Sequence, residues 1–290
     1  MKNRVIKGSG KSLFKSSRFK LSVTLLVVLL IAVLAFFTLH GQKSSSNNQK
    51  TILLGSSPGP YSELFLKGIK PILEKEGYHV TNKSFNNLLN ADVALSEGQV
   101  DLSVDQHTAY MKNFNTEKKA NLVALTPIPT VPTGIYPAQK ITLKNVAFGD
   151  RIAIPNDPAN TARAYNLLVK AGWITLKKGT DLIKATKKDI ATNKYNLKIT
   201  EMDSATIPRS KQDFEYVVLP GSVAYSAKIS TKKILLAETL RSEYRLVAVT
   251  TKKNAKTAWA KAVKKAYQST EFKNYVKQHN NDNYWVLPNN

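Results

Sequence analysis

Residues 21–39 are apolar apart from Ser22, Thr24 and Thr38, and none of them carries a charge. As a helix, this stretch of nineteen residues would span roughly 28 Å, close to the thickness of the hydrocarbon core of a bilayer. Residues 1–20 contain seven Lys and Arg and no acidic residue. The excess of positive charge before the apolar stretch predicts a cytoplasmic segment at 1–20, a transmembrane signal anchor at 21–40 and an extracellular remainder.

A cleaved secretory signal is the alternative for the same stretch. Such signals have an apolar core of about 7 to 15 residues that ends in small residues at the cut site. Residues 35–41 read Ala-Phe-Phe-Thr-Leu-His-Gly and lack that pattern, which favours an uncleaved anchor. Residues 41–50 are rich in Ser, Asn, Gln and Lys, a composition typical of a flexible linker.

From residue 51 onward, short apolar runs alternate with segments in which apolar residues recur at helical spacing. The runs predict buried strands at 51–55, 78–85, 100–104, 121–126, 151–154, 197–200, 216–219, 234–237 and 245–250. The amphipathic segments predict helices at 61–76, 88–97, 107–114, 158–171, 255–268 and 270–279. Pro71 should kink or split the first helix.

This alternation predicts an α/β fold with parallel sheet. Two such blocks of strands and helices suggest two lobes with a ligand cleft between them, at the carboxyl ends of the strands. We expect residues 51–135 plus 233–290 to form the first lobe and residues 136–232 to form the second.

Charge and composition narrow the possible functions. The chain has 43 Lys and Arg, 20 Asp and Glu, a net charge of +23 and no cysteine. Without cysteine there can be no disulfide, thiolate metal site or thioether-linked lipid. Outside the N-terminal segment the basic residues are interspersed with all the acids, and no nucleic-acid-binding motif is present. We therefore expect a basic surface beside an anionic wall or membrane, and no nucleic-acid partner.

One candidate site begins at the predicted helix after residue 157. Asp157 can cap that helix, and Pro158 occupies the first helical position, where its missing N–H costs nothing. Asn156, Asn160 and Arg163 then lie at i, i+4 and i+7 on one face. Two amides and a guanidinium beside the positive end of a helix can receive a carboxylate. An ordinary capped helix with exposed polar residues is the alternative.

A second candidate follows the predicted strand at 100–104. His107 and Tyr110 are spaced i, i+3 and can line an amphipathic pocket, although an ordinary helix start is about equally consistent with them. Asp101, Asp105 and His107 could in principle hold a metal, but no second histidine lies near in sequence. The chain has no nucleophile elbow, Walker loop or dinucleotide fingerprint. The sequence gives no case for catalysis or for a cofactor.

Residues 51–275 resemble the NlpA/MetQ family, the methionine-type substrate-binding proteins of ABC importers. The resemblance rests on Gly59-Pro60 with Glu63, Asp101, Gln106-His107, Tyr110, Gly134-Ile135-Tyr136, residues 152–164, Pro208-Arg209, residues 266–269 and Glu271. The string Ile-Pro-Asn-Asp-Pro-Ala-Asn-Thr-Ala-Arg at 154–163 is its most specific part.

The resemblance implies a two-lobed, type II periplasmic-binding-protein fold that closes on a small amino-acid ligand. By match to the family, Arg163 would hold the ligand carboxylate with Asn160 nearby, while His107 and Tyr110 would line the pocket from the opposite lobe. The residues that we expect to bind the ligand are Arg163, Asn160, Asn156, His107, Tyr110, Gln106, Asp105 and Tyr136.

Several positions depart from the family pattern. Asp105 stands where methionine binders usually have an aromatic residue, Leu88 where a pocket tyrosine is expected, Pro220 in place of an asparagine and Tyr61 in place of a histidine. These changes remove aromatic packing and add a carboxylate. The hypothesis is a ligand other than plain methionine, either another amino acid or a short peptide, with Asp105 facing an amino group.

The resulting expectation is a monomeric, membrane-anchored extracellular receptor that passes its ligand to an ABC permease and its ATPase and performs no chemistry. The uncleaved helix would replace the lipidated cysteine by which family members are commonly held. An Arg163→Ala variant should then lose binding without unfolding. A surface adhesin or wall-associated module that keeps the fold but not transport is the alternative.

Overall fold

The computed structural model describes residues 50–280 and 284–288, and these fall in one structural unit, Asn48–Asn290. The expected cytoplasmic segment at 1–20, the transmembrane anchor at 21–40 and all but the last residue of the linker at 41–50 lie outside the described residues. No helix within the described part of the chain is long and apolar enough to cross a membrane.

The first lobe is built on strands from both ends of the described chain. They are β1 (Thr51–Ser56), β2 (His79–Ser84), β3 (Ser103–His107), β4 (Leu122–Pro127) and β12 (Leu246–Thr251). β1 and β2 are parallel, and a bridge between Leu54 and Leu102 places β1 beside the start of β3. β12 runs antiparallel between β3 and β4, so this lobe requires residues that are more than a hundred positions apart.

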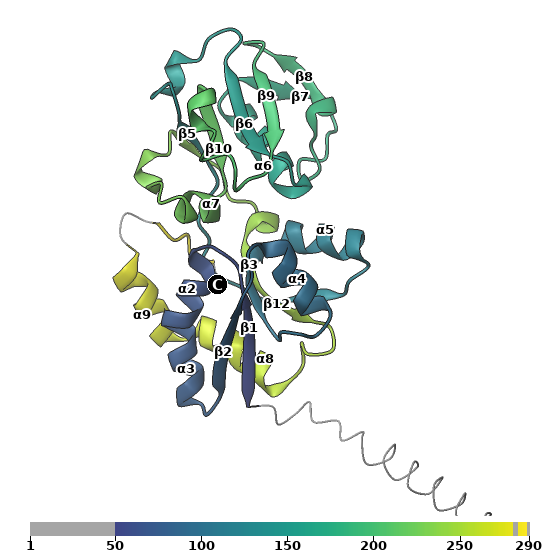
Figure 1. Cartoon of the computed structure of the whole chain (residues 1–290), viewed down its shortest axis with the longest axis vertical. Coiled ribbons are helices and arrows are strands. Elements are labelled where there is room, and N and C mark those ends of the chain that lie inside the picture. Colours follow the sequence, from purple (N-terminus) through teal and green to yellow (C-terminus); the bar gives the residue numbers. More distant parts are fainter. Residues whose placement is uncertain (1–49, 281–283, 289–290) are drawn as a thin grey trace, which may run out of the picture. The chain divides into compact units, whose positions relative to one another are not determined.

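Helices cover these strands (Figure 1). They are α2 (Pro60–Leu64), the π-helical segment η1 (Phe65–Ile69), α3 (Lys70–Lys75), α4 (Leu88–Ser96), α5 (Thr108–Lys118), α8 (Ala258–Gln268) and α9 (Thr270–His279). The helix predicted at 61–76 is thus split just before Pro71, as expected from a residue that has no N–H to donate. Phe65, Leu73 and Trp259 are fully buried in the main core of this lobe.

The second lobe contains a five-stranded sheet in the order β11-β5-β10-β6-β9. Its strands are β5 (Gly134–Pro137), β6 (Arg151–Pro155), β9 (Lys198–Met202), β10 (Tyr216–Leu219) and β11 (Leu236–Ala237). Helix α6 (Pro158–Lys170) buries Tyr165 and Leu168 in the core of this lobe, beside Trp173 and Tyr216. The hairpin β7–β8 (Ile174–Leu176 and Ile190–Asn193) and helix α7 (Gly221–Ser226) complete it.

The structure differs from the sequence expectation in three respects. The sheets are mixed rather than parallel, because β12 and β5 run antiparallel to their neighbours. β3 begins three residues later than predicted, so His107 ends a strand instead of opening a helix. β5 and β11 pair in the second sheet, although the boundaries drawn at 135/136 and 232/233 divided these strands or assigned them to the first lobe.

Leu73 offers a test of the first core. Its side chain is fully buried, whereas that of Leu89 on α4 is 43% exposed. We expect Leu73→Ala to lower the free energy of unfolding by about 2–5 kcal/mol, because it removes buried methyl groups and leaves a cavity. Leu89→Ala should change it by less than about 0.5 kcal/mol. Urea unfolding of the two variants checks this, and equal effects would contradict the assignment of the core.

Candidate functional site

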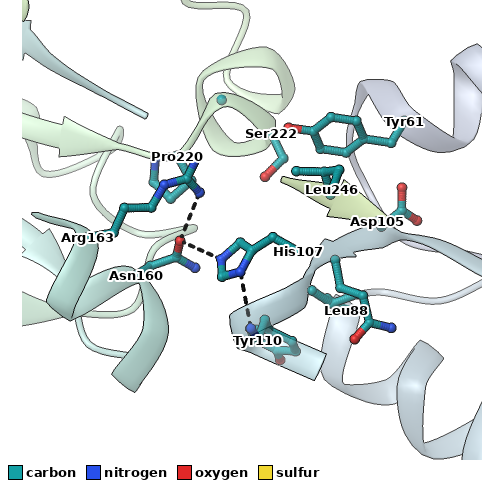
Figure 2. Close-up of a pocket in the computed structure, with 12 residues that line it drawn as sticks. Tyr61, Leu88, Asp105, His107, Tyr110, Asn160, Arg163, Pro220, Ser222 and Leu246 are labelled. Atoms are coloured by element: carbon teal, nitrogen blue, oxygen red, sulfur yellow. Dashed lines mark hydrogen bonds between the residues drawn. The ribbon is translucent and has the colours of Figure 1, made fainter. Parts of the chain in front are cut away.

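A small cavity lies where the carboxyl end of β3 meets the N-terminal half of α6 (Figure 2). Its volume of about 50 Å³ is room for a few water molecules only. Both lobes contribute to its wall. The lining residues are Tyr61, Leu88, Asp105, Gln106, His107, Tyr110, Asn160, Arg163, Pro220, Gly221, Ser222 and Leu246.

His107 connects the two lobes at this cavity. It ends β3 and caps α5, and its Nδ1 accepts a hydrogen bond from the Tyr110 backbone N–H at 3.1 Å. The neutral ring therefore carries its proton on Nε2, which lies 3.3 Å from the Asn160 Oδ1 on α6. Burial, followed by the positive charge of Arg163, lowers the pKa of His107 to about 3, so the ring is a neutral hydrogen-bond donor.

Asn160 is held in place by the cap of its own helix. Asp157 accepts from the Asn160 backbone N–H at 3.0 Å and from its side-chain amide at 3.1 Å, which confirms Asp157 as the predicted N-cap. The amide nitrogen is thereby directed to Asp157, and the carbonyl oxygen is directed to His107. The same oxygen lies 3.4 Å from Nη1 of Arg163. Figure 2 shows this chain of contacts continuing from Arg163 to Tyr110.

Arg163 is paired with a residue that the sequence analysis did not identify. Its Nε donates to Glu238 Oε2 at 2.6 Å and its Nη2 donates to Glu238 Oε1. The side chains of Arg163 and Glu238 are only 3% and 5% exposed. Glu238 also accepts from the Thr133 backbone N–H at 2.7 Å, and the Tyr244 ring lies 5.2 Å from the guanidinium carbon. Nη1 is the nitrogen that remains directed toward Asn160.

This pairing corrects the expectation that Arg163→Ala leaves the fold intact. Removing the guanidinium would leave the Glu238 carboxylate buried without its cation, which is strongly destabilising. Glu238 directly follows β11, which lies within the stretch 234–237 that was predicted as a strand, so its place at the carboxyl end of a strand was the available signal. Its pairing with Arg163 depends on a contact across 75 positions of sequence and has no local signal.

Asp105 and Gln106 line the cavity from the first lobe. Asp105 accepts from the backbone N–H groups of Ser57 and Ser62 at 2.8 and 3.1 Å, and from the Ser62 hydroxyl at 2.6 Å. Burial raises the pKa of Asp105, and these hydrogen bonds limit the rise. Gln106 donates from Nε2 to Asp92 Oδ1 at 2.6 Å. Asp105 therefore fixes the turn that leads into α2 as well as facing the cavity.

Two residues expected at the site lie elsewhere. Asn156 is exposed at the end of β6 and does not line the cavity. Tyr136 is buried on β5 among Ile207, Val217 and Leu219, and it does not line the cavity either. Ser222 and Leu246, in contrast, contribute to the wall and were not anticipated. They are ordinary residues in sequence, and only the meeting of α7 and β12 brings them to the cavity.

Comparison with known proteins identifies the family. The family model described as NlpA lipoprotein matches residues 52–287, which is most of the chain. The chain belongs to the NlpA lipoprotein family. "D-methionine-binding lipoprotein MetQ" of Salmonella typhi is 30% identical over 243 residues, covering 83% of this chain and 89% of that protein. "Membrane lipoprotein TpN32" of Treponema pallidum is 30% identical over 230 residues, covering 79% and 85%.

One solved structure that is similar to this chain carries a ligand. The nutrient-binding protein from Burkholderia cenocepacia bound to methionine is 33% identical and has a TM-score of 0.76. The alignment covers 82% of this chain and all of that one. The mixed α/β fold described above is therefore one that this chain shares with a methionine-bound binding protein.

The depressed pKa of His107 predicts a loss of stability in acid. The pKa of about 3 in the folded chain lies below the usual value near 6.5 for an unfolded histidine. Unfolding therefore takes up a proton between these values, and stability falls as pH decreases. In His107→Asn the side-chain oxygen can still cap α5 but cannot titrate.

We expect the stability advantage of the wild type over His107→Asn to shrink by about 1.4 kcal/mol per pH unit below pH 6. Urea unfolding at pH 7 and pH 5 measures this difference between the two proteins. Parallel changes in the two proteins would show that His107 does not titrate on unfolding.

The buried ion pair between Arg163 and Glu238 leads to a further prediction about stability. Arg163→Ala should lower the free energy of unfolding by about 3–5 kcal/mol, because it strands a buried carboxylate. In the double variant Arg163→Ala/Glu238→Gln, the neutral amide can still accept from Thr133, so much of this loss should be recovered. Urea unfolding of the single and double variants provides the measurement, and simple additivity of the two single losses would contradict the pairing.

Proposed function

We propose that this chain is the substrate-binding protein of an ABC importer. It captures methionine, another amino acid or a short peptide in the cavity of Figure 2 and delivers it to a permease and its ATPase. The observation that carries the proposal is a buried polar cavity lined by both lobes, in a chain whose relatives are named as methionine-binding proteins.

The polar atoms around the cavity suit a zwitterion. Arg163 Nη1 and the protonated Nε2 of His107 are directed to Asn160 Oδ1 in this structure, and both would donate to the ligand carboxylate when it takes the place of that oxygen. Asp105 and Gln106 supply acceptors for an amino group from the other lobe. Recognition in this form requires binding and orientation but no chemical step.

Entry of a ligand requires the lobes to move apart, because the cavity of about 50 Å³ is too small for an amino acid. Residues 128–133 and 238–245 connect the two sheets and would act as the hinge. On this proposal the boundaries between the lobes lie within these two connections. The permease would recognise the protein with its lobes closed around the ligand.

The membrane attachment that we propose is the apolar stretch at 21–40, with residues 1–20 in the cytoplasm and the body outside. The chain contains no cysteine that could carry a lipid, and the charge distribution before the apolar stretch favours this orientation. The intact mass of the protein extracted from membranes tests this, because cleavage near residue 41 would remove the anchor.

Ligand-dependent stabilisation tests the proposed function. A ligand at about 100 times its Kd adds about 2.7 kcal/mol to the stability of the folded state. For a body of this size we expect methionine or a related amino acid to raise Tm by roughly 5 °C or more. Asn160→Leu, which removes the carbonyl that orients His107 and Arg163 and places an apolar side chain beside the ligand carboxylate, should abolish the rise.

A panel of amino acids and dipeptides that produces no shift at any concentration would contradict a receptor role and favour the adhesin alternative. The exposed variant Leu89→Ala is the matched control, since it lies outside the cavity wall and should retain the shift.

A further inference from the structure

One acidic residue of the cavity wall, Asp105, has no cationic residue beside it in the described part of the chain. Arg163 is the single cationic residue and Asp105 the single acidic residue among the twelve that line the cavity. Arg163 already forms a buried ion pair with Glu238, and His107 is neutral at physiological pH. Because Glu238 is paired with Arg163, Asp105 is left as the charged residue of the wall without a cation beside it.

The hydrogen-bond partners of Asp105 are all neutral. Its carboxylate accepts from the N–H groups of Ser57 and Ser62 and from the Ser62 hydroxyl, and the Ser57 side chain is also hydrogen-bonded to it. The residue is 8% exposed. A buried carboxylate with no cation beside it is costly unless a ligand supplies one.

Gln106 is a second, independent indication that a ligand donates a hydrogen bond in this cavity. It lines the cavity, is 1% exposed, and its Oε1 has no hydrogen-bond partner among the described residues. Its Nε2 donates to Oδ1 of the fully buried Asp92 at 2.6 Å, and in this arrangement the acceptor Oε1 is left unsatisfied.

We propose that the ligand is an amino acid with a cationic side chain, whose added positive charge is received by Asp105 and Gln106. The inference rests on the proposed function and specifies its substrate class. A side-chain ammonium would pair with the Asp105 carboxylate and donate to Gln106 Oε1, while the ligand carboxylate meets Arg163 Nη1 and takes the place of Asn160 Oδ1 at His107 Nε2. One positive charge on the ligand then balances the charge of Asp105.

The pKa shifts of the buried carboxyl groups are also consistent with a ligand cation beside Asp105. Burial, followed by the charge of Asp105, raises the pKa of Asp92 well above its usual value. The charge of Asp105 thus opposes the ionisation of Asp92, and no Lys or Arg is among the residues that lower the pKa of either carboxyl group. A ligand cation beside Asp105 would supply the missing opposite charge.

The test uses two matched pairs of free amino acids titrated calorimetrically into the folded protein. L-lysine and L-norleucine differ in the terminal ammonium, and S-methyl-L-methionine and L-ethionine have the same number of heavy atoms but differ by one positive charge. We expect the cationic member of each pair to bind at least about tenfold more tightly, with the larger ratio for lysine because its ammonium also donates hydrogen bonds.

Variants locate the effect. Asp105→Asn should reduce the affinity for lysine about tenfold or more and change that for norleucine by less than about threefold. Asp213→Asn removes the same charge from an exposed position outside the cavity and should change neither. If Asp105→Asn weakens the turn at Ser57 and Ser62 so far that the protein does not fold, the two ligand pairs on the wild type still decide.

The outcomes separate the inference from the function. Norleucine or ethionine binding as tightly as its cationic counterpart would overturn the inference and leave the receptor role intact. Absence of binding by all four compounds would overturn the inference, and the receptor role itself would be contradicted only if the panel of amino acids and dipeptides also produced no shift.

Discussion

Arg163 and Glu238 are both buried, and neither could remain charged in the interior without the other. The geometry of a bidentate guanidinium and carboxylate is restrictive, so the pair fixes the position of α6 relative to the segment after β11. Glu238 is in turn fixed by the Thr133 N–H in front of β5. The two connections between the sheets, at 128–133 and 238–245, are thus joined through the Glu238 carboxylate, and the orientation of the cavity donors depends on it.

The ion pair between Arg163 and Glu238 also determines which hydrogen bonds form across the cavity. With two nitrogens of Arg163 directed to Glu238, Nη1 is left for Asn160, whose carbonyl also meets His107. Because His107 caps α5, the orientation of its ring is set by the first lobe and its partner by the second. This contact joins the two lobes, so the surroundings of His107 depend on elements of both.

The sequence predicted those parts of the fold and site that are determined locally. The cap at Asp157, the split helix at Pro71 and most buried strands follow from nearest-neighbour patterns. β5, with Gly134 and Pro137 in four residues, carries no such pattern. Glu238 and the direction of the guanidinium depend on contacts distant in sequence, and the assignment of Tyr136 to the cavity was wrong because strand β5 turns this side chain into a core.

The hydrogen-bonding groups of both cavity walls follow from the same constraints. On α6, Glu238 takes Nε and Nη2 of Arg163 and leaves Nη1, whereas Asp157 takes the amide nitrogen of Asn160 and leaves its carbonyl oxygen. On β3, Asp92 takes an N–H of Gln106 and leaves Oε1 as an acceptor, while His107 presents Nε2 as a donor. On the proposed function, a ligand carboxylate would lie beside Arg163 and His107 and a cationic group beside Asp105 and Gln106. The positions of these charged and polar groups, rather than the shape of an aromatic pocket, would then set the orientation of the ligand.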